Sequence, residues 1–324
     1  MKVIAVEEHV TSPLYQSKIT PTPRRLASLA DSSERVGHDV MAEMLDIGKS
    51  RIAAMDETGI DLQLLSLTMP GPQGLPADEA ITVATDANDL MAAACKAYPG
   101  RFAALAALPT PDVAASVKEL QRTVRTLGFK GTMINGHTNG EFLDDKKYWP
   151  IFEAAQALDV PVYLHPRDPH PLAAQAYFQG YQELSTAGWG FTMDTVSHIL
   201  RLIFSGVFDT FPKLQLVIGH LGEGIPFFLE RLDHHTCRAM KRRGLKKTVV
   251  EYMRDNVTVT TSGNFSIAAL QCTIAVLGID KVIFSIDWPY ESNREGMDFF
   301  RHLPLGPGDM AKLAHGNAER VFKL

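Results

Sequence analysis

Short apolar runs alternate along the chain with segments in which apolar residues recur every three or four positions. The first pattern is typical of buried strands and the second of helices that pack one face against a sheet. We predict strands over residues 2–7, 62–67, 102–108, 130–135, 160–165, 214–220, 257–262 and 282–287. We predict helices over 44–58, 78–97, 112–127, 148–158 and 194–209. Asp112 suits a helix start and Gly59 a helix end.

Eight strands separated by helices predict an α/β fold, the (β/α)8 TIM barrel. The competing architecture is a doubly wound open sheet, but no GxGxxG motif follows the first strand. Two long connections interrupt the alternation. We expect a polar loop over 11–39, rich in Pro, Ser and Arg, and a lid over 166–190, which contains four aromatic residues. No linker or repeat divides the chain, so we expect one domain over 1–324.

Composition narrows the range of partners. The chain has 324 residues, 45% of them hydrophobic, and a formal net charge of -5 without the basic stripe of a nucleic-acid-binding protein. The apolar start is followed directly by two carboxylates, unlike a signal peptide, and no apolar run approaches the roughly 20 residues that span a bilayer. We therefore expect no nucleic-acid or membrane partner. The cysteines are widely spaced and predict reduced thiols in a cytoplasmic protein; they are Cys95, Cys237 and Cys272.

Polar side chains with metal-binding chemistry end several predicted strands. Catalytic groups of such barrels lie at the carboxyl ends of the strands. Glu7 and His9 are two residues apart, so on a strand they point to the same side. His165, His220 and Asp287 each close a nearly all-apolar run. Further polar strand ends are Ser66, Thr68, Asn135, Thr261 and Ser262.

Imidazole and carboxylate groups together suit Zn2+, Mn2+ or Fe2+. A single histidine is more often a core or surface group, and an aspartate such as Asp287, taken alone, is more often the cap of the next helix. Because such residues coincide at the ends of four strands, a metal site is the better interpretation. His198 differs, since it lies inside a helical run and is expected to pack in the core.

Five motifs make the chain resemble the amidohydrolase-related metal-dependent decarboxylases. It is most similar to the gamma-resorcylate and dihydroxybenzoate decarboxylases, and less so to the 5-carboxyvanillate and amino-carboxymuconate-semialdehyde decarboxylases. The resemblance extends over essentially the whole chain. The motifs are EEH (7–9), YLHPRDP (163–169), GHLGEG (219–224), TTSGNF (260–265) and FSIDWPY (284–290).

This resemblance implies non-oxidative decarboxylation of a hydroxybenzoate-type aromatic acid, without an organic cofactor, by a homodimer or homotetramer. Asp287 is the expected proton donor, supported by His220, which Glu223 orients. The expected cofactor is one divalent ion, Zn2+ or Mn2+ with Mg2+ as a further candidate, held by Glu7, His9, His165 and Asp287. The expected contacts to the aromatic carboxylate are Arg51, Asn135, Arg231 and Tyr290.

Two alternatives stay open. The first is a metal-dependent hydrolase of an ester, lactone or amide, in which His220 and Asp287 activate a water. Dinuclear hydrolases of the superfamily carry a carboxylated lysine at the end of the fourth strand, where this chain has Asn135. The second is a catalytically silent barrel that serves as a binding or scaffold protein. For Arg51 and Arg231, surface ion pairs are the alternative to substrate binding.

Overall fold

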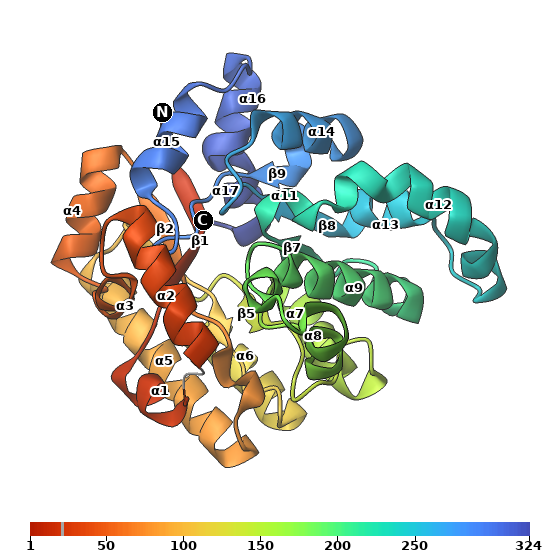
Figure 1. The fold of residues 1–324 in the computed structure, drawn as a ribbon, viewed down its shortest axis with the longest axis horizontal. Coiled ribbons are helices and arrows are strands. Elements are labelled where there is room, and N and C mark those ends of the chain that lie inside the picture. Colours follow the sequence, from red (N-terminus) through yellow and green to blue (C-terminus); the bar gives the residue numbers. More distant parts are fainter. Residues whose placement is uncertain (21–22) are drawn as a thin grey trace.

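Alternating apolar side chains in the strands build the centre of the molecule. The computed structural model describes residues 1–20 and 23–324, in which parallel strands form a ring surrounded by helices (Figure 1). The strands are β1 (Ile4–Val10), β2 (Leu62–Leu67), β3 (Phe102–Ala104), β4 (Ala106–Ala107), β5 (Thr132–Asn135), β6 (Val162–His165), β7 (Leu216–Ile218), β8 (Val257–Thr260) and β9 (Val282–Ile283).

Helices follow the strands and cover the outside of the ring (Figure 1). The α-helices are α1 (Pro13–Lys18), α2 (Pro23–Val36), α3 (Val40–Leu45), α4 (Lys49–Thr58), α5 (Ala77–Ala97), α6 (Val113–Thr126), α7 (Trp149–Leu158), α8 (Pro171–Phe178), α9 (Gly190–Ser205), α10 (Val207–Thr210), α11 (His220–Glu223), α12 (Ile225–Arg242), α13 (Val249–Asn256), α14 (Ile267–Leu277), α15 (Asn293–Arg301), α16 (Pro307–Ala311) and α17 (Asn317–Phe322). Short 3-10 helices are η1 (Gly71–Gly74), η2 (Lys146–Tyr148), η3 (Gln182–Ser185) and η4 (Ile279–Lys281), and η5 (Lys312–Gly316) is a π-helix.

The barrel closes between its last and first strands through side chains as well as backbone. Hydrogen-bonded order runs β1-β2-β3 in one sheet and β4 to β9 in the other. At the seam, the His9 N–H donates to the Trp288 carbonyl at 2.6 Å. The Ser285 hydroxyl accepts from the backbone N–H groups of Val6 and Glu7, at 3.1 and 2.8 Å. The predicted (β/α)8 barrel is confirmed.

Three apolar clusters lie within the described residues, and the two main ones result from the alternation of side chains along the strands. One fills the barrel interior and includes Ile4, Leu64 and Tyr163, and Phe322 of α17 packs against them. The larger one lies between the strands and the outer helices. Within the described part of the chain, no helix is both long and apolar enough to cross a membrane.

The third predicted strand appears as two, because it changes partner at Leu105. The Leu105 N–H donates to Leu65 of β2, whereas the Ala106 N–H donates to Gly131 beside β5. The last strand ends four residues earlier than predicted, at Ile283. Beyond it, Ser285 and Ile286 bond to the Glu8 carboxylate instead of continuing the ladder.

The loop predicted over 11–39 is wrong over most of its length, because α1 and α2 occupy it; residues 21–22 lie outside the described part. Pro13 and Pro23 are the first residues of these helices, a position where proline is favoured, although proline is also a common loop residue. Helix 44–58 is divided, because Asp46 is extended. Helix 194–209 begins at Gly190 and is interrupted at Gly206. Asp112 and Gly59 cap as predicted.

Candidate metal centre

The first strand turns two neighbouring residues inward. Register in β1 shifts between Ala5 and Glu8, an irregularity that lets Val6 and Glu7 both face the barrel interior. Alternation then resumes, so that Glu8 points toward the seam and His9 again points inward. Glu7 and His9 therefore face the same side, as predicted. All three residues from Glu7 to His9 are fully buried.

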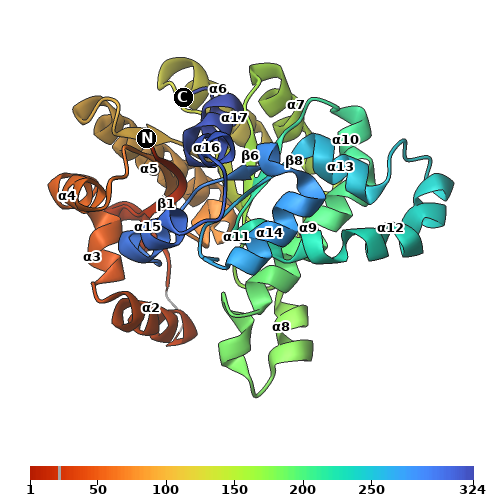
Figure 2. The same ribbon diagram turned by 90° about the horizontal axis from the view of Figure 1, so that it is seen from above.

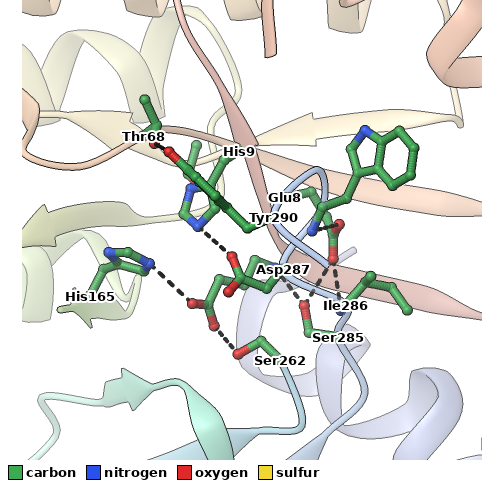
Figure 3. A network of polar contacts seen from close by, with 12 residues as sticks. Glu8, His9, Thr68, His165, Ser262, Ser285, Ile286, Asp287 and Tyr290 are labelled. Carbon is green, nitrogen blue, oxygen red and sulfur yellow. Dashed lines mark hydrogen bonds and ion pairs between the residues drawn. The ribbon is translucent and has the colours of Figure 1, made fainter. Parts of the chain in front are cut away.

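Four side chains from three places in the sequence meet at the carboxyl end of the barrel. Each of Glu7, His9, His165 and Asp287 offers one ligand atom, and these atoms lie within 4.8 Å of one another. Nε2 of His9 lies 3.0 Å from Oδ1 of Asp287. Nε2 of His165 lies 3.2 Å from Oε1 of Glu7. Figure 3 shows the approach of His9 to Asp287 as a dashed line, with His165 beside them.

The facing atoms of this cluster lack ordinary hydrogen-bond partners. Apart from their mutual approaches, Oε1 of Glu7, Nε2 of His9 and Oδ1 of Asp287 have none among the described residues, although all are buried. Buried polar atoms rarely lack a hydrogen-bond partner. Two imidazoles and two carboxylates are a donor set that suits Zn2+ or Mn2+. The residues therefore fit a divalent metal ion.

The other oxygen of Glu7 is held by hydroxyl groups. Oε2 accepts from Tyr163, from Ser262 and, at 3.1 Å, from Thr260. Burial alone would raise the pKa of Glu7, but the facing imidazoles of His220 and His165 outweigh it and hold that pKa well below its usual range. Glu7 thus stays a carboxylate in the barrel interior, and the direction of Oε1 is fixed.

Glu8 positions the segment that carries Asp287. Its carboxylate accepts from the Ser285 hydroxyl at 2.9 Å and from the backbone N–H groups of Ile286 and Trp288, both at 3.1 Å (Figure 3). Burial raises the pKa of Glu8 to about 8 against these hydrogen bonds. Asp287 lies between Ile286 and Trp288, whose N–H groups bond to Glu8, and it has a left-handed conformation with φ of 81°. It does not cap α15, whose N-cap is Ser292.

A strained turn after β7 presents His220. Five consecutive residues have positive φ, namely His220, Leu221, Gly222, Glu223 and Gly224. A left-handed conformation costs roughly 1–2 kcal/mol for each residue other than glycine. Neighbouring side chains hold the turn, since Asn264 and Thr273 donate to its carbonyls, both at 3.4 Å. Strain of this kind is typical of functional sites.

The turn brings His220 against three carboxylates. Nδ1 lies 2.6 Å from Oε1 of Glu223, and Nε2 lies 3.7 Å from Oε1 of Glu7 and 3.6 Å from Oδ2 of Asp287. Burial lowers the pKa of His220, but these carboxylates outweigh it and raise it well above the usual value. Burial raises the pKa of Asp287, and hydrogen bonds from His220 and His9 bring it below its ordinary value. His220 is therefore a proton-bearing group beside the cluster.

A cavity of about 890 Å³ opens onto this cluster. His165, His220, Asp287 and Tyr290 line its inner end. The Tyr290 hydroxyl bonds to Thr68 at 2.7 Å, and its ring packs edge-on against His9 (Figure 3). Helices α2, α9 and α12 supply most of the outer wall, and Figure 2 shows α2 and α8 projecting from the same side of the barrel. The volume is within the range of small-molecule sites.

Two of the four predicted substrate-binding residues lie away from the cavity. The Arg51 guanidinium is fully buried, and it donates to the carbonyls of His9 at 2.7 Å and Glu43 at 3.1 Å. Arg51 thus stabilises the end of β1 through the His9 carbonyl, and it does not line the cavity. Asn135 is also buried and absent from the lining, and its amide donates to Leu67 at 3.4 Å. Arg51 and Asn135 therefore do not line the cavity, whereas Arg231 and Tyr290 do, and substrate contact by any of the four stays a prediction.

Some lining residues had no sequence signal that singled them out. Arg24 and Arg25 reach the cavity from α2, which the sequence pattern suggested was loop. Arg24 pairs with Asp168 at 2.5 Å. Thr192 of α9 donates to Glu223, and nothing in its helical surroundings marks it. Glu8 and Tyr163 lie within the recognised motifs, but only the structure shows that Glu8 bonds to the segment around Asp287 and that Tyr163 bonds to Glu7.

Comparisons with known proteins agree with the fold and with the chemistry of the cluster. A family model described as Amidohydrolase matches residues 38–324. Gamma-resorcylate decarboxylase from Rhizobium radiobacter is 37% identical, over 99% of this chain and 98% of that protein.

Solved structures of two decarboxylases superpose over 100% of this chain. Dihydroxybenzoic acid decarboxylase from Polaromonas sp. JS666, with manganese and the inhibitor 2-nitroresorcinol, is 36% identical with a TM-score of 0.89 and is covered to 97%. 5-Carboxyvanillate decarboxylase from Novosphingobium aromaticivorans, with manganese and 4-hydroxy-3-methoxy-5-nitrobenzoic acid, is 35% identical with a TM-score of 0.92 and is covered to 96%. The predicted family is confirmed, and the chain belongs to the amidohydrolase family.

Proposed function

We propose that the protein is a metal-dependent carboxy-lyase that removes CO2 without oxidation from hydroxybenzoate-type aromatic acids. The observation that carries the proposal is the cluster of Glu7, His9, His165 and Asp287, with ligand atoms within 4.8 Å of one another at the inner end of the cavity. The related decarboxylases named above, two of them with manganese, support the same reaction class.

We propose one divalent ion for each chain, held by these four residues. Manganese in the related structures supports Mn2+, and the two imidazoles leave Zn2+ as an alternative, with Mg2+ a further candidate. When bound, such an ion acts as a Lewis acid and a template for the oxygens of the substrate. Asn135 at the end of β5, where dinuclear relatives carry a carboxylated lysine, supports a single ion. The reaction needs no organic cofactor.

Residues of the chain contact the aromatic ring and deliver the proton that replaces CO2. The bond between the ring carbon and the carboxylate carbon breaks, CO2 leaves, and the electron pair stays on the ring carbon, which then takes a proton. Asp287 is ionised at rest, so it first takes a proton from His220, whose Nε2 lies 3.6 Å from its Oδ2, and then delivers this proton to the ring carbon. Solvent reaching the cavity replenishes the proton of His220. Tyr290 and Arg231 line the space for the aromatic acid.

Exposed aromatic side chains near the cavity support an assembly of identical subunits, a dimer or a tetramer. Tyr177, Tyr181, Trp189, Phe227 and Phe228 are all at least half exposed, which is unusual for so many large apolar groups in neighbouring elements. The three cysteines are unpaired, which supports a cytoplasmic location.

The test is a turnover assay on purified protein loaded with Mn2+, Zn2+ or Mg2+. A panel of 2-hydroxybenzoates is supplied, and CO2 is measured together with the metal content. We expect about one ion for each chain and CO2 release from at least one acid. Acid release from esters, lactones or amides without CO2 would instead establish the hydrolase. Glu7→Gln should lower both metal content and CO2 release, and Glu141→Gln is its matched control, because Glu141 is exposed and belongs neither to the cluster nor to the cavity lining.

A further inference from the structure

Glu223 is held at both of its oxygens, and only one of these interactions involves the histidine that it orients. Oε1 faces Nδ1 of His220 at 2.6 Å. Oε2 accepts a hydrogen bond from the Thr192 hydroxyl, also at 2.6 Å. The Thr192 hydroxyl must be the donor, because an ionised carboxylate only accepts. Glu223 is almost fully buried, so its carboxylate depends on these two hydrogen bonds for its orientation.

Thr192 comes from a different part of the barrel than the two residues that it supports. His220 and Glu223 lie on the left-handed turn after β7, whereas Thr192 lies in the first turn of α9. All three line the cavity. A hydrogen bond from a separate element opposes rotation of the Glu223 carboxylate, which the turn alone leaves free.

Packing at the start of α9 fixes where Thr192 lies. A side chain on Gly190 would lie 2.7 Å from backbone atoms of Ser185, so helix and preceding turn are in direct contact. The Ser185 hydroxyl accepts from Arg24 of α2 at 2.6 Å. The Phe191 N–H donates to the Thr186 carbonyl at 3.1 Å. The start of α9, which carries the Thr192 hydroxyl, is thus held by contacts with the preceding turn, and that turn is bonded to α2.

We propose that Thr192 is a positioning residue of the reaction: through Glu223 it directs Nε2 of His220 toward Asp287. The inference rests on the proposed function, since it assigns His220 a part in proton transfer. Thr192 does not touch the reacting carbon. Its effect is on how often the imidazole is aligned when the proton moves, which changes kcat more than KM.

The test compares Thr192→Val with Thr192→Ser in metal-loaded protein. Valine keeps the shape but removes the donor, and serine restores it. Partners that orient a functional group in a metal site typically change activity by roughly 10–100-fold when they are removed. We expect Thr192→Val to lower kcat by about 10-fold or more while KM changes by less than about 3-fold, with metal content unchanged. Thr192→Ser should stay within about 3-fold of the wild type. Thr82→Val is the control, because its hydroxyl bonds only within α5.

A double-mutant cycle with Glu223→Gln separates positioning from a general packing effect. If Thr192 acts through Glu223, the valine variant adds little further decrease in kcat in the glutamine background. Equal decreases in both backgrounds would overturn the inference, as would wild-type kcat in Thr192→Val. A serine variant as impaired as the valine variant would do the same.

A crystal structure of Thr192→Val decides the question without turnover. We expect the Glu223 carboxylate to rotate and the distance from its Oε1 to Nδ1 of His220 to lengthen. An unchanged distance would overturn the inference even if the wild type released no CO2. If instead this distance lengthens in the variant but the wild type releases no CO2, the proposed function alone is overturned.

Discussion

Two groups of three histidines lie in this molecule, and they differ in what faces their rings. The carboxylate-facing histidines are His9, His165 and His220. The aromatic-facing histidines are His137, His170 and His198. Rings within each group are close, with centroids 4.6 Å apart for His9 and His165, and 5.8 Å apart for His137 and His170.

The carboxylate-facing histidines direct their Nε2 atoms at Glu7 or Asp287. Their neighbours supply negative charge that can hold either a cation or a proton. The four-residue group at this end of the barrel is the one metal-binding arrangement found among residues 1–20 and 23–324.

The aromatic-facing histidines surround Phe142, and two of them accept backbone hydrogen bonds from the same loop. Nε2 of His198 accepts from the Leu143 N–H at 2.9 Å, and Nδ1 of His137 accepts from the Gly140 N–H at 3.1 Å. Burial lowers the pKa of His198 to about 3 and that of His137 to about 4, and nearby cations add to the effect. These two rings are neutral acceptors that shape a loop. The facing partner, not the residue type, therefore separates a functional histidine from a packing one.

The largest expected difference between the groups is in metal binding. His165→Ala removes one of four ligands, so we expect loss of the metal and of CO2 release. His198→Ala should retain about one ion for each chain in the folded fraction. Elemental analysis of both variants, after circular dichroism has verified folding, checks this. Stoichiometric metal in His165→Ala would erase the distinction between the two groups.

A smaller loss, of turnover but not of the shape of the cluster, is expected when the proposed general acid Asp287 is replaced by an amide. Asp287→Asn is nearly isosteric, and loss of general acid catalysis alone typically costs about 10²–10⁴-fold in rate. We expect at least that loss, measured as CO2 release in samples whose metal content is known. The wild type should also incorporate solvent deuterium at the carbon that lost CO2. Near-normal turnover by metal-loaded Asp287→Asn would assign the proton delivery to His220 directly.

The sequence predicts one group of histidines well because its signal is local. His165 and His220 end apolar strands, and barrel topology alone brings such ends together. Asp287 is predicted on the same ground, although β9 ends at Ile283 and Glu8 holds the segment beyond it. Motif resemblance then supplies Glu223.

Residues that act across elements are not predictable in this way. Arg51 resembles a substrate-binding residue in the sequence, but its direction depends on packing behind β1, which no local pattern encodes. Helix α2 is predicted as loop because its polar sequence begins with Pro23, and proline suits the first position of a helix as well as a loop. Thr192 is one threonine among many in helices, and its role depends on a turn thirty or so residues later. Side-chain direction and long-range contact are what the pattern leaves open.

The smallest expected effect concerns how the aromatic-facing histidines respond to acid. The pKa of His198 is about 3 in the folded protein, against about 6.5 for an unperturbed histidine. Between these values the unfolded chain binds a proton that the folded protein does not. The stability contributed by neutral His198 is therefore complete above pH 6.5 and is lost as pH falls toward 3, by about 1.4 kcal/mol for each pH unit.

His198→Gln tests this, because glutamine can still accept from the Leu143 N–H but does not titrate. Urea unfolding of metal-free protein between about pH 4 and 7 should show a free energy of unfolding that falls less steeply with acid in the variant than in the wild type. The exposed histidine variant His302→Gln should instead parallel the wild type. Parallel curves for His198→Gln would mean that the ring already takes up a proton in the folded state. The aromatic-facing histidines would then hold a proton in the folded protein, as His220 of the carboxylate-facing group does.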